Sequence, residues 1–334
     1  MCGIGEVCGR RGGSIIVIAP PGVSGTRLKV NQYRLLLHAT GPGRLPNLVG
    51  PPLRGGFGKA LKDGCCPFTD PLCPQCLQAR ECAYGYLFDS AVTDADRVLR
   101  RYPHTPHPFV FDTPAAPAPD SSGRDRLAVG LSLVAAANEY LPTVLAALER
   151  LGSYGLGGDR AGFEITAVET PKETLWRRGD RPLRAVPEAE VWTVRPLRRG
   201  PVALRVTSLT PLRLQVDGGV ARSVTARDLL SASLRRLELL CRVHGREEDW
   251  DLDAAELVRE ATESEITTVQ EEWRDQDRYS RRQGRSMPLG GLMGEWVLSG
   301  PVTRLAPILA AAGTLHVGKS TAFGLGQFRC EAVR

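Results

Sequence analysis

Four cysteines lie close together in the sequence and could bind a metal ion. Cys73 and Cys76 form a CxxC pair, Cys66 and Cys82 flank it, and Cys65 is a spare neighbour. A CxxC pair with two further thiolates can close a tetrahedral zinc site without an open position, so such an ion would be structural. Four cysteines can also bind an iron–sulfur cluster, or they could be unrelated buried thiols. We expect zinc, because nothing else in the sequence suggests redox chemistry.

The C-terminal segment contains a string with the spacing of a nucleotide-binding P-loop. Gly313, Gly318, Lys319 and Ser320 form this string. A P-loop requires a preceding strand and a following helix. Here a glycine-broken turn and a strand follow instead, so we expect no nucleotide cofactor.

The same glycine-rich segment could bind RNA. Glycines let the backbone approach another chain and expose amide donors, cationic and hydroxyl side chains contact phosphates, and an aromatic ring stacks on a base. Taken alone, the pattern also fits an ordinary glycine-rich turn. The candidate RNA-binding residues are Gly318, Ser320, Thr321, Phe323, Gly324, Gly326 and Arg329.

Histidines are natural acid or base candidates near neutral pH. We rank His316, inside the glycine-rich segment, first and His38, at the end of an expected strand, second. The alternatives are a side chain packed under the loop for His316 and a plain sheet residue for His38. His104 and His107 lie in a proline-rich stretch from which they could reach RNA, although such a stretch favours a solvated loop. His244 ends a helix, where a cation complements the dipole.

The composition permits nucleic-acid binding without requiring it. The chain has 43 basic and 37 acidic residues, and only five of the basic residues are lysine. Guanidinium groups suit phosphate recognition, although a GC-rich genome would also enrich arginine. The 42% apolar content supports folded cores. We find no targeting or membrane segment, and nine cysteines without a secretory context suggest a cytoplasmic protein.

The order of expected elements divides the chain into two αβ units. We expect a poorly ordered arm at 1–27, a first domain at 28–198 and a second at 199–334. The pattern predicts an α+β fold of two tandem ferredoxin-like (RRM-like) domains, with the four-cysteine zinc knuckle at 65–82 inserted in the first. The expected strands are 33–39, 162–168, 204–210, 293–300 and 327–333. The segment 127–135 alternates and leads into a helix that runs to about 151, and the other expected helices are 53–62, 226–245 and 254–262. Residues 103–118 are expected to be extended, and an arginine-rich loop follows the last of these helices.

The tail LHVGKSTAFGLGQFR at 315–329 closely resembles the signature of the repeat-associated RNA-binding (RAMP) superfamily, and of its CRISPR repeat-processing endoribonuclease branch in particular. Other segments resemble the same branch in the expected order, and this order is the strong part of the evidence. They are LRGGFGKAL at 53–61, YGYLF at 84–88, PHPFVFDTP at 106–114, LGSYGLGGDRAGF at 151–163, TPLRL at 210–214, and RYSRRQ at 278–283 followed by MPLGGLMG.

The resemblance implies two ferredoxin-like domains with CRISPR repeat RNA held across both, and cleavage without a metal. The 2′-hydroxyl would attack the adjacent phosphate, leaving a 2′,3′-cyclic phosphate and a 5′-hydroxyl. This chemistry needs a base, an acid and cations around the charged phosphorane. The implied partners are repeat or guide RNA and, as a further candidate, other subunits of a CRISPR effector complex.

The family's usual histidine lies on or near the first helix, but the helix expected here carries lysines and no histidine. This departure leaves a non-catalytic guide-RNA-binding subunit of an interference complex as the alternative function. The candidate catalytic residues are His316, His38, Lys59 and Lys319. The further candidate RNA contacts are Arg54, Arg278, Tyr279, Arg281, Arg282 and Gln283.

Overall fold

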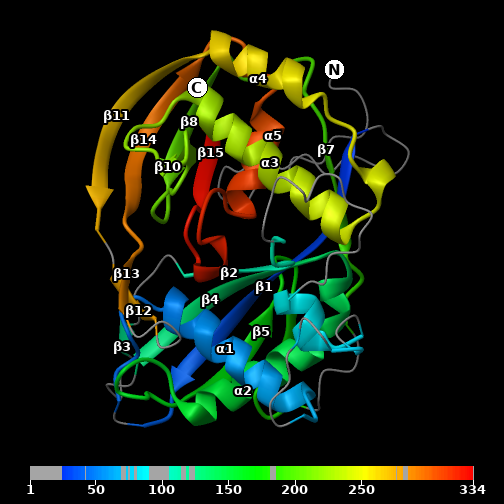
Figure 1. Cartoon of the computed structure of the whole chain (residues 1–334), viewed down its shortest axis with the longest axis vertical. Helices are drawn as coiled ribbons and strands as arrows, with labels where there is room; N and C mark the ends of the chain where they lie inside the picture. The colour runs from blue at the N-terminus through cyan, green and yellow to red at the C-terminus, as the bar shows by residue number, and fades with distance from the viewer. Residues whose placement is uncertain are drawn as a thin grey trace. The chain divides into compact units, whose positions relative to one another are not determined.

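The computed structural model describes residues 25–41, 43–68, 73, 76–78, 81–89, 105–113, 118–119, 125–180, 186–275, 277–280 and 285–333. The chain forms two compact units (Figure 1). The N-terminal unit is Val30–Glu190, and the C-terminal unit is Val191–Arg334 together with the residues up to Lys29. Most of the expected arm at 1–27 lies outside the described residues.

The N-terminal unit is an antiparallel sheet with two helices. The sheet order is β2-β4-β1-β5-β6, with β3 beside β4 and β7 beside β1. The core order β-α-β-β-α-β, with the first and third strands central, is the ferredoxin-like arrangement. The elements are β1 (Thr26–Ala39), α1 (Gly50–Cys65), the short π-helix η2 (Gly85–Asp89), β2 (Phe109–Asp112), β3 (Ala118–Pro119), β4 (Asp125–Val134), the 3₁₀ helix η4 (Ala135–Tyr140), α2 (Leu141–Tyr154), β5 (Phe163–Glu169) and β6 (Thr174–Arg177). Strand β7 (Glu190–Val194) begins at the last residue of this unit and otherwise belongs to the C-terminal unit.

Helices α1 and α2 cover one face of this sheet (Figure 1). Alternate side chains of β1, including Leu35 and Leu37, are buried with Phe57 of α1 and Leu148 of α2. The glycines of α1 permit this close packing. A Cβ at Gly58 would fall 2.8 Å from the ring of Phe88. Glycine lowers the helix propensity at this position, but it allows α1 to pack closely against η2.

The C-terminal unit repeats the same element order. Its four-stranded sheet has the order β11-β14-β8-β15, and every neighbouring pair is antiparallel. Helices α3 and α5 pack together, and α5 packs on β15. The elements are β8 (Ala203–Ser208), the hairpin β9 (Gln215–Val216) and β10 (Gly219–Val220), α3 (Ala226–His244), the 3₁₀ turn η5 (Glu247–Asp249), α4 (Ala254–Glu263), β11 (Glu265–Arg274), the hairpin β12 (Asp277–Ser280) and β13 (Arg285–Pro288), β14 (Gly291–Ser299), α5 (Ala306–Thr314), the 3₁₀ turn η6 (Thr321–Phe323) and β15 (Phe328–Ala332).

The prediction of a mixed α+β chain with antiparallel sheets is confirmed, but three details of the second half differ from expectation. The expected arginine-rich loop contains the hairpin β12–β13. Strand β11 was not expected because most of its side chains are exposed, so it lacks the apolar alternation of a half-buried strand. Helix α5 was not expected because it is buried almost all round and therefore has no amphipathic period.

The zinc knuckle and the domain boundaries at 28–198 and 199–334 stay predictions. No helix in the described ranges is both long and apolar enough to cross a membrane.

Candidate RNA-binding sites in the two units

The glycine-rich loop, residues 315–327, is fixed by backbone hydrogen bonds to the TPLRL segment. The Lys319 amide donates to the carbonyl of Arg213 over 2.9 Å, and the Gly326 amide donates to the carbonyl of Pro211 over 3.0 Å. The sequence resemblance singled out these two segments separately, and the fold places them side by side.

The MPLGGLMG segment joins the same framework. Leu212 and Leu292 exchange backbone hydrogen bonds of 2.8 and 2.9 Å. The guanidinium of Arg213 donates to the carbonyl of Gly290, and burial lowers the pKa of Arg213. Two stretches that are distant in the sequence therefore form one framework beneath the loop.

The glycine-rich loop turns through left-handed backbone conformations. Gly318, Gly324 and Gly326 have φ of 81°, 81° and 86°, and Ser320 has φ of 65°. At Gly326 a Cβ would also collide with the carbonyl of Val317, because these two residues pair through a 2.9 Å hydrogen bond. This position therefore requires glycine for two independent reasons.

We expect Gly326→Ala to lower the free energy of unfolding by about 2–4 kcal/mol, the sum of left-handed strain and a backbone collision. Gly218→Ala is the matched control, because Gly218 has φ of 81° in the same unit but open space around its Cβ. The control should lose only about 1–2 kcal/mol. Urea unfolding followed by circular dichroism compares the two, and equal losses would contradict the collision.

The loop divides its residues between solvent and interior. Gly318 and Lys319 are exposed, as is Arg329 on β15, so these can meet RNA. The side chains of the one-turn helix that follows Lys319 are half-buried. Gly324 and Gly326 are buried and shape the loop, and their contact with RNA stays a prediction.

The side chain of His316 is buried in the C-terminal unit. Its side chain is 0% exposed, and its Nδ1 lies 3.0 Å from the carbonyl oxygen of Leu325. The burial argues against the prediction that His316 is a catalytic residue, because the imidazole has no surface with which to contact a substrate. Its neighbour Leu315 accepts a 3.0 Å hydrogen bond from Nε of the buried Arg236, which anchors the start of the loop to α3.

The surrounding elements also differ from those of a P-loop. Gly313 lies inside α5, so a helix rather than a strand precedes the string. The 3₁₀ turn η6 and then β15 follow it. The string is therefore a helix-to-strand connection, the reverse of the arrangement that cradles a nucleotide.

In the N-terminal unit, a histidine lies against the first helix. Nη2 of Arg54 on α1 is 2.9 Å from Nε2 of His107, in the segment that leads into β2. The guanidinium lies 4.9 Å from the centre of the Phe88 ring, and His107 stacks on Phe109 at 5.5 Å. A guanidinium only donates, so Nε2 accepts and the imidazole in this contact is neutral.

Sequence reasoning had placed His107 in a solvated loop. The overlooked pattern is the alternation of His107, Phe109 and Phe111, which puts all three on one face of an extended segment. Phe57 of α1 packs edge-on against both phenylalanines at 5.4 Å. The packing of this face therefore brings His107 against α1. The family resemblance implies a histidine on or near this helix.

The other two catalytic candidates of the N-terminal unit are His38 and Lys59, and neither is as well placed as His107 to act as a base. His38 lies on β1 between Arg126 and Glu164, on the sheet face opposite the helices. Lys59 is exposed and bonds to Asp63 at 2.5 Å. The hydrogen bond to Asp63 raises the pKa of Lys59, so Lys59 is protonated at neutral pH and cannot serve as the base.

The arginine-rich candidates are only partly described. Arg278 and Tyr279 belong to β12, and we describe their backbone alone. Arg281, Arg282 and Gln283 lie outside the described residues.

Two of the cysteines at the end of α1 and before η2 lie close together. Sγ of Cys65, not of Cys66, lies 3.9 Å from Sγ of Cys82. The Cys66 thiol instead donates to the carbonyl of Phe68. Burial, together with Cys82, raises the pKa of Cys65 to about 11. Within the described part of the chain, no three potential ligand side chains gather closely enough to bind a metal.

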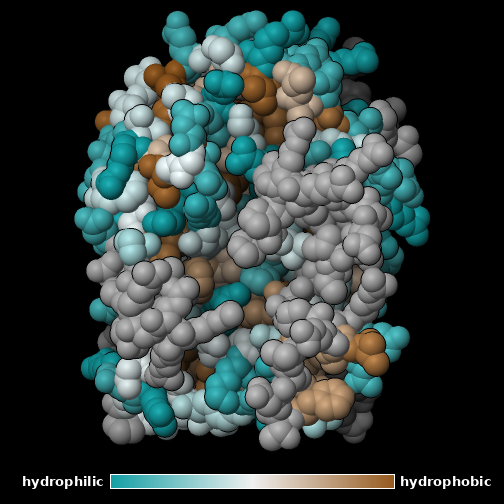
Figure 2. Space-filling view, viewed as in Figure 1, coloured by the Kyte–Doolittle hydropathy of each residue, from teal (hydrophilic) through white to brown (hydrophobic). Residues whose placement is uncertain are grey.

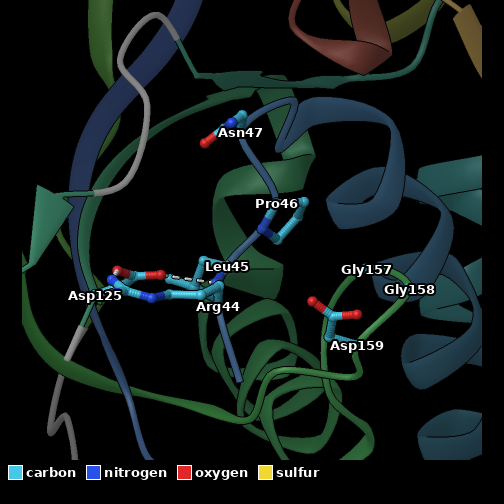
Figure 3. Close-up of a pocket in the computed structure, with 8 residues that line it drawn as sticks. All are labelled: Arg44, Leu45, Pro46, Asn47, Asp125, Gly157, Gly158 and Asp159. Atoms are coloured by element: carbon cyan, nitrogen blue, oxygen red, sulfur yellow. Dashed lines mark hydrogen bonds and ion pairs between the residues drawn. The ribbon is translucent and has the colours of Figure 1, made fainter. Parts of the chain in front are cut away.

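A pocket of about 410 Å³ lies between the segment before α1 and the turn after α2 (Figure 3). Arg44 faces Asp125 across 2.8 Å, and the Leu45 amide donates to the same carboxylate. The carboxylate compensates the charge of Arg44, which makes this pocket a poor anion site. Its lining residues are Arg44, Leu45, Pro46, Asn47, Asp125, Gly157, Gly158 and Asp159, and none was predicted as a site residue.

A known protein family matches most of the second half of the chain. Residues 206–328, which run from β8 to β15 and include the glycine-rich loop, match the family of the CRISPR-associated endoribonuclease Cas6. This part of the chain is therefore similar to Cas6 endoribonucleases. The resemblance seen in the glycine-rich tail is thus confirmed. Residues 28–188 match a family described as an N-terminal domain.

Individual proteins are similar to the chain over part or most of its length. A protein of Archaeoglobus fulgidus, named only as uncharacterized, is 30% identical over 143 residues, which span 43% of this chain and 45% of that protein. A structure of a Cas6 product complex covers 92% of this chain and 100% of its own, with 16% identity and a TM-score of 0.50. Thermus thermophilus Cas6 covers the same shares with 14% identity and a TM-score of 0.47. At such identities the product complex supports the fold alone.

Proposed function

We propose that the protein is an endoribonuclease that cleaves CRISPR repeat RNA without a metal ion. The 2′-hydroxyl would attack the adjacent phosphate, leaving a 2′,3′-cyclic phosphate and a 5′-hydroxyl. The observation that carries the proposal is the Cas6 match over 206–328, because it includes the glycine-rich loop that exposes Lys319. Repeat or guide RNA is the proposed partner, and effector-complex subunits remain further candidates.

We propose His107 as the base of this reaction and Arg54 as its phosphate contact. A bound phosphate would accept the hydrogen bonds of the guanidinium and thereby release Nε2 of His107. The neutral imidazole could then take the proton of the 2′-hydroxyl. This assignment replaces the buried His316, and it is supported by the 2.9 Å contact between the two side chains.

The deciding experiment is incubation of the purified full chain with repeat RNA in EDTA, with the product ends mapped. Cleavage that leaves a cyclic phosphate would support the proposal. Tight binding without cleavage between about pH 6 and 9, a range that spans the histidine pKa, would instead make the protein a guide-RNA-binding subunit. That alternative is favoured by one feature, the absence of a histidine on α1.

Lys319 should contribute to RNA affinity through charge. We expect Lys319→Ala to weaken binding and to reduce the slope of log K against log salt by about 0.7, the value for one contact with single-stranded nucleic acid. Lys29→Ala removes an equally exposed lysine from β1 and is the control. Fluorescence anisotropy across a salt series measures both, and an unchanged slope for Lys319→Ala would exclude a phosphate contact.

A further inference from the structure

An arginine is stacked on a tryptophan at the end of β11, in the C-terminal unit. The guanidinium carbon of Arg222 lies 3.6 Å from the centre of the Trp273 ring. Arg222 is exposed, and no described carboxylate forms an ion pair with it. A guanidinium stacked in this way keeps its second face and its N–H edge for a ligand.

The neighbours of Trp273 fix the position of its ring. A Cβ at Gly290 would fall 2.9 Å from the indole nitrogen and 3.0 Å from Cζ2, so glycine provides the space that the ring occupies. The indole N–H donates to a carboxylate oxygen of Asp275 over 2.6 Å. Because the ring is held, the guanidinium stacked on it is oriented before a ligand arrives, which lowers the entropy lost on binding.

The surface around this stack is polar. Most side chains of β11 are polar or charged and exposed. Figure 2 shows largely hydrophilic surface at the left of the C-terminal unit, where Figure 1 places β11. Arg222 and Trp273 therefore present a flat cationic group on a hydrophilic surface, where a planar, polar ligand can bind.

A row of paired backbone segments connects the stack to the glycine-rich loop. Trp273 pairs with Leu292 of β14, and Leu292 pairs with Leu212. The next residue, Arg213, pairs with Gly318 in the loop. Three such spacings of about 4.8 Å put the backbone of Trp273 about 14 Å from that of Gly318. A single RNA strand covers this distance in a few nucleotides.

We infer that Arg222, held by Trp273, stacks on one unpaired nucleobase of the RNA that the glycine-rich loop binds. A base is favoured over a phosphate, because the carboxylate of Asp275 beside the indole repels an anion. A phosphate also needs only the charge of an arginine, whereas a base needs the oriented plane. The inference deepens the proposed function and rests on it, since it requires RNA at the loop.

The test is the affinity of the full chain for repeat RNA that is 2′-O-methylated throughout and so lacks the attacking hydroxyl. Arg222→Ala and Arg222→Lys should both weaken binding by about 5–50-fold, because lysine keeps the charge but offers no plane for stacking. Arg227→Ala removes an exposed charge from the first turn of α3 and is the control, which should bind nearly as wild type does. Wild-type affinity in Arg222→Lys would overturn the stack and indicate a phosphate contact instead.

A scan with abasic nucleotides identifies the stacked base. One abasic position should weaken binding to wild type by about 5–50-fold and should cost Arg222→Ala little more, because the base and the guanidinium act as a pair. The absence of any such position would contradict the inference. Binding that is insensitive to Arg222 removes this inference alone, whereas a wild-type chain that does not bind the RNA removes the proposed function with it.

Discussion

Cleavage of repeat RNA is expected to slow by about 10²–10⁴-fold when His107 is replaced by alanine, the usual contribution of a positioned acid or base. RNA affinity should change little, because Arg54 and the glycine-rich loop would still contact phosphates. Single-turnover cleavage and an independent binding assay separate the two effects.

His38→Ala is the matched control, because His38 is also half-buried in the N-terminal unit but lies on the opposite sheet face. It should cleave at close to the wild-type rate. A purely structural role for His107 makes a different prediction, since His107→Gln would then restore the rate by preserving packing and a hydrogen bond to Arg54. A base cannot be replaced by glutamine, and the pH–rate profile of wild type should show the histidine titration that the variants lack.

The second large effect concerns stability. Arg236→Ala should lower the free energy of unfolding by about 2–4 kcal/mol, because it opens a cavity beside α5 and leaves the Leu315 carbonyl without its donor. The Arg236 residue is 8% exposed and its Nε donates to that carbonyl over 3.0 Å. Burial lowers the pKa of Arg236 to about 10, so the group is still charged at neutral pH.

Arg235→Ala provides the comparison, because it removes the same charge from an exposed position one residue earlier on α3. It should cost less than about 0.5 kcal/mol. Urea unfolding of both variants decides the matter. If the two unfold at the same urea concentration, Arg236 does not anchor the glycine-rich loop as we infer. If they differ as expected, hydrogen exchange in residues 315–327 should also rise in Arg236→Ala alone.

The sequence by itself determined the local features of this protein. The amphipathic repeat of α3 predicted its helix, and the helix ends where Gly245 follows. The tail at 315–329 and the segments around it resembled the CRISPR repeat-processing branch, and the Cas6 family model matches residues 206–328. The glycines of this tail meet local backbone requirements, such as the φ of 86° at Gly326. Such requirements restrict the residue type at single positions, so they can be recognised in the sequence.

Only the tertiary structure decided which side chains meet. His107 and Arg54 are separated by 53 positions and come together because Phe57 packs against Phe109 and Phe111. His316 follows α5 directly, and the packing of its unit buries it. Cys65 and Cys66 are adjacent, yet only Cys65 lies beside Cys82, because consecutive side chains at the end of a helix point in different directions. Spacing along the chain suggests which residues could act together, but contacts between distant segments depend on how sheet and helices pack.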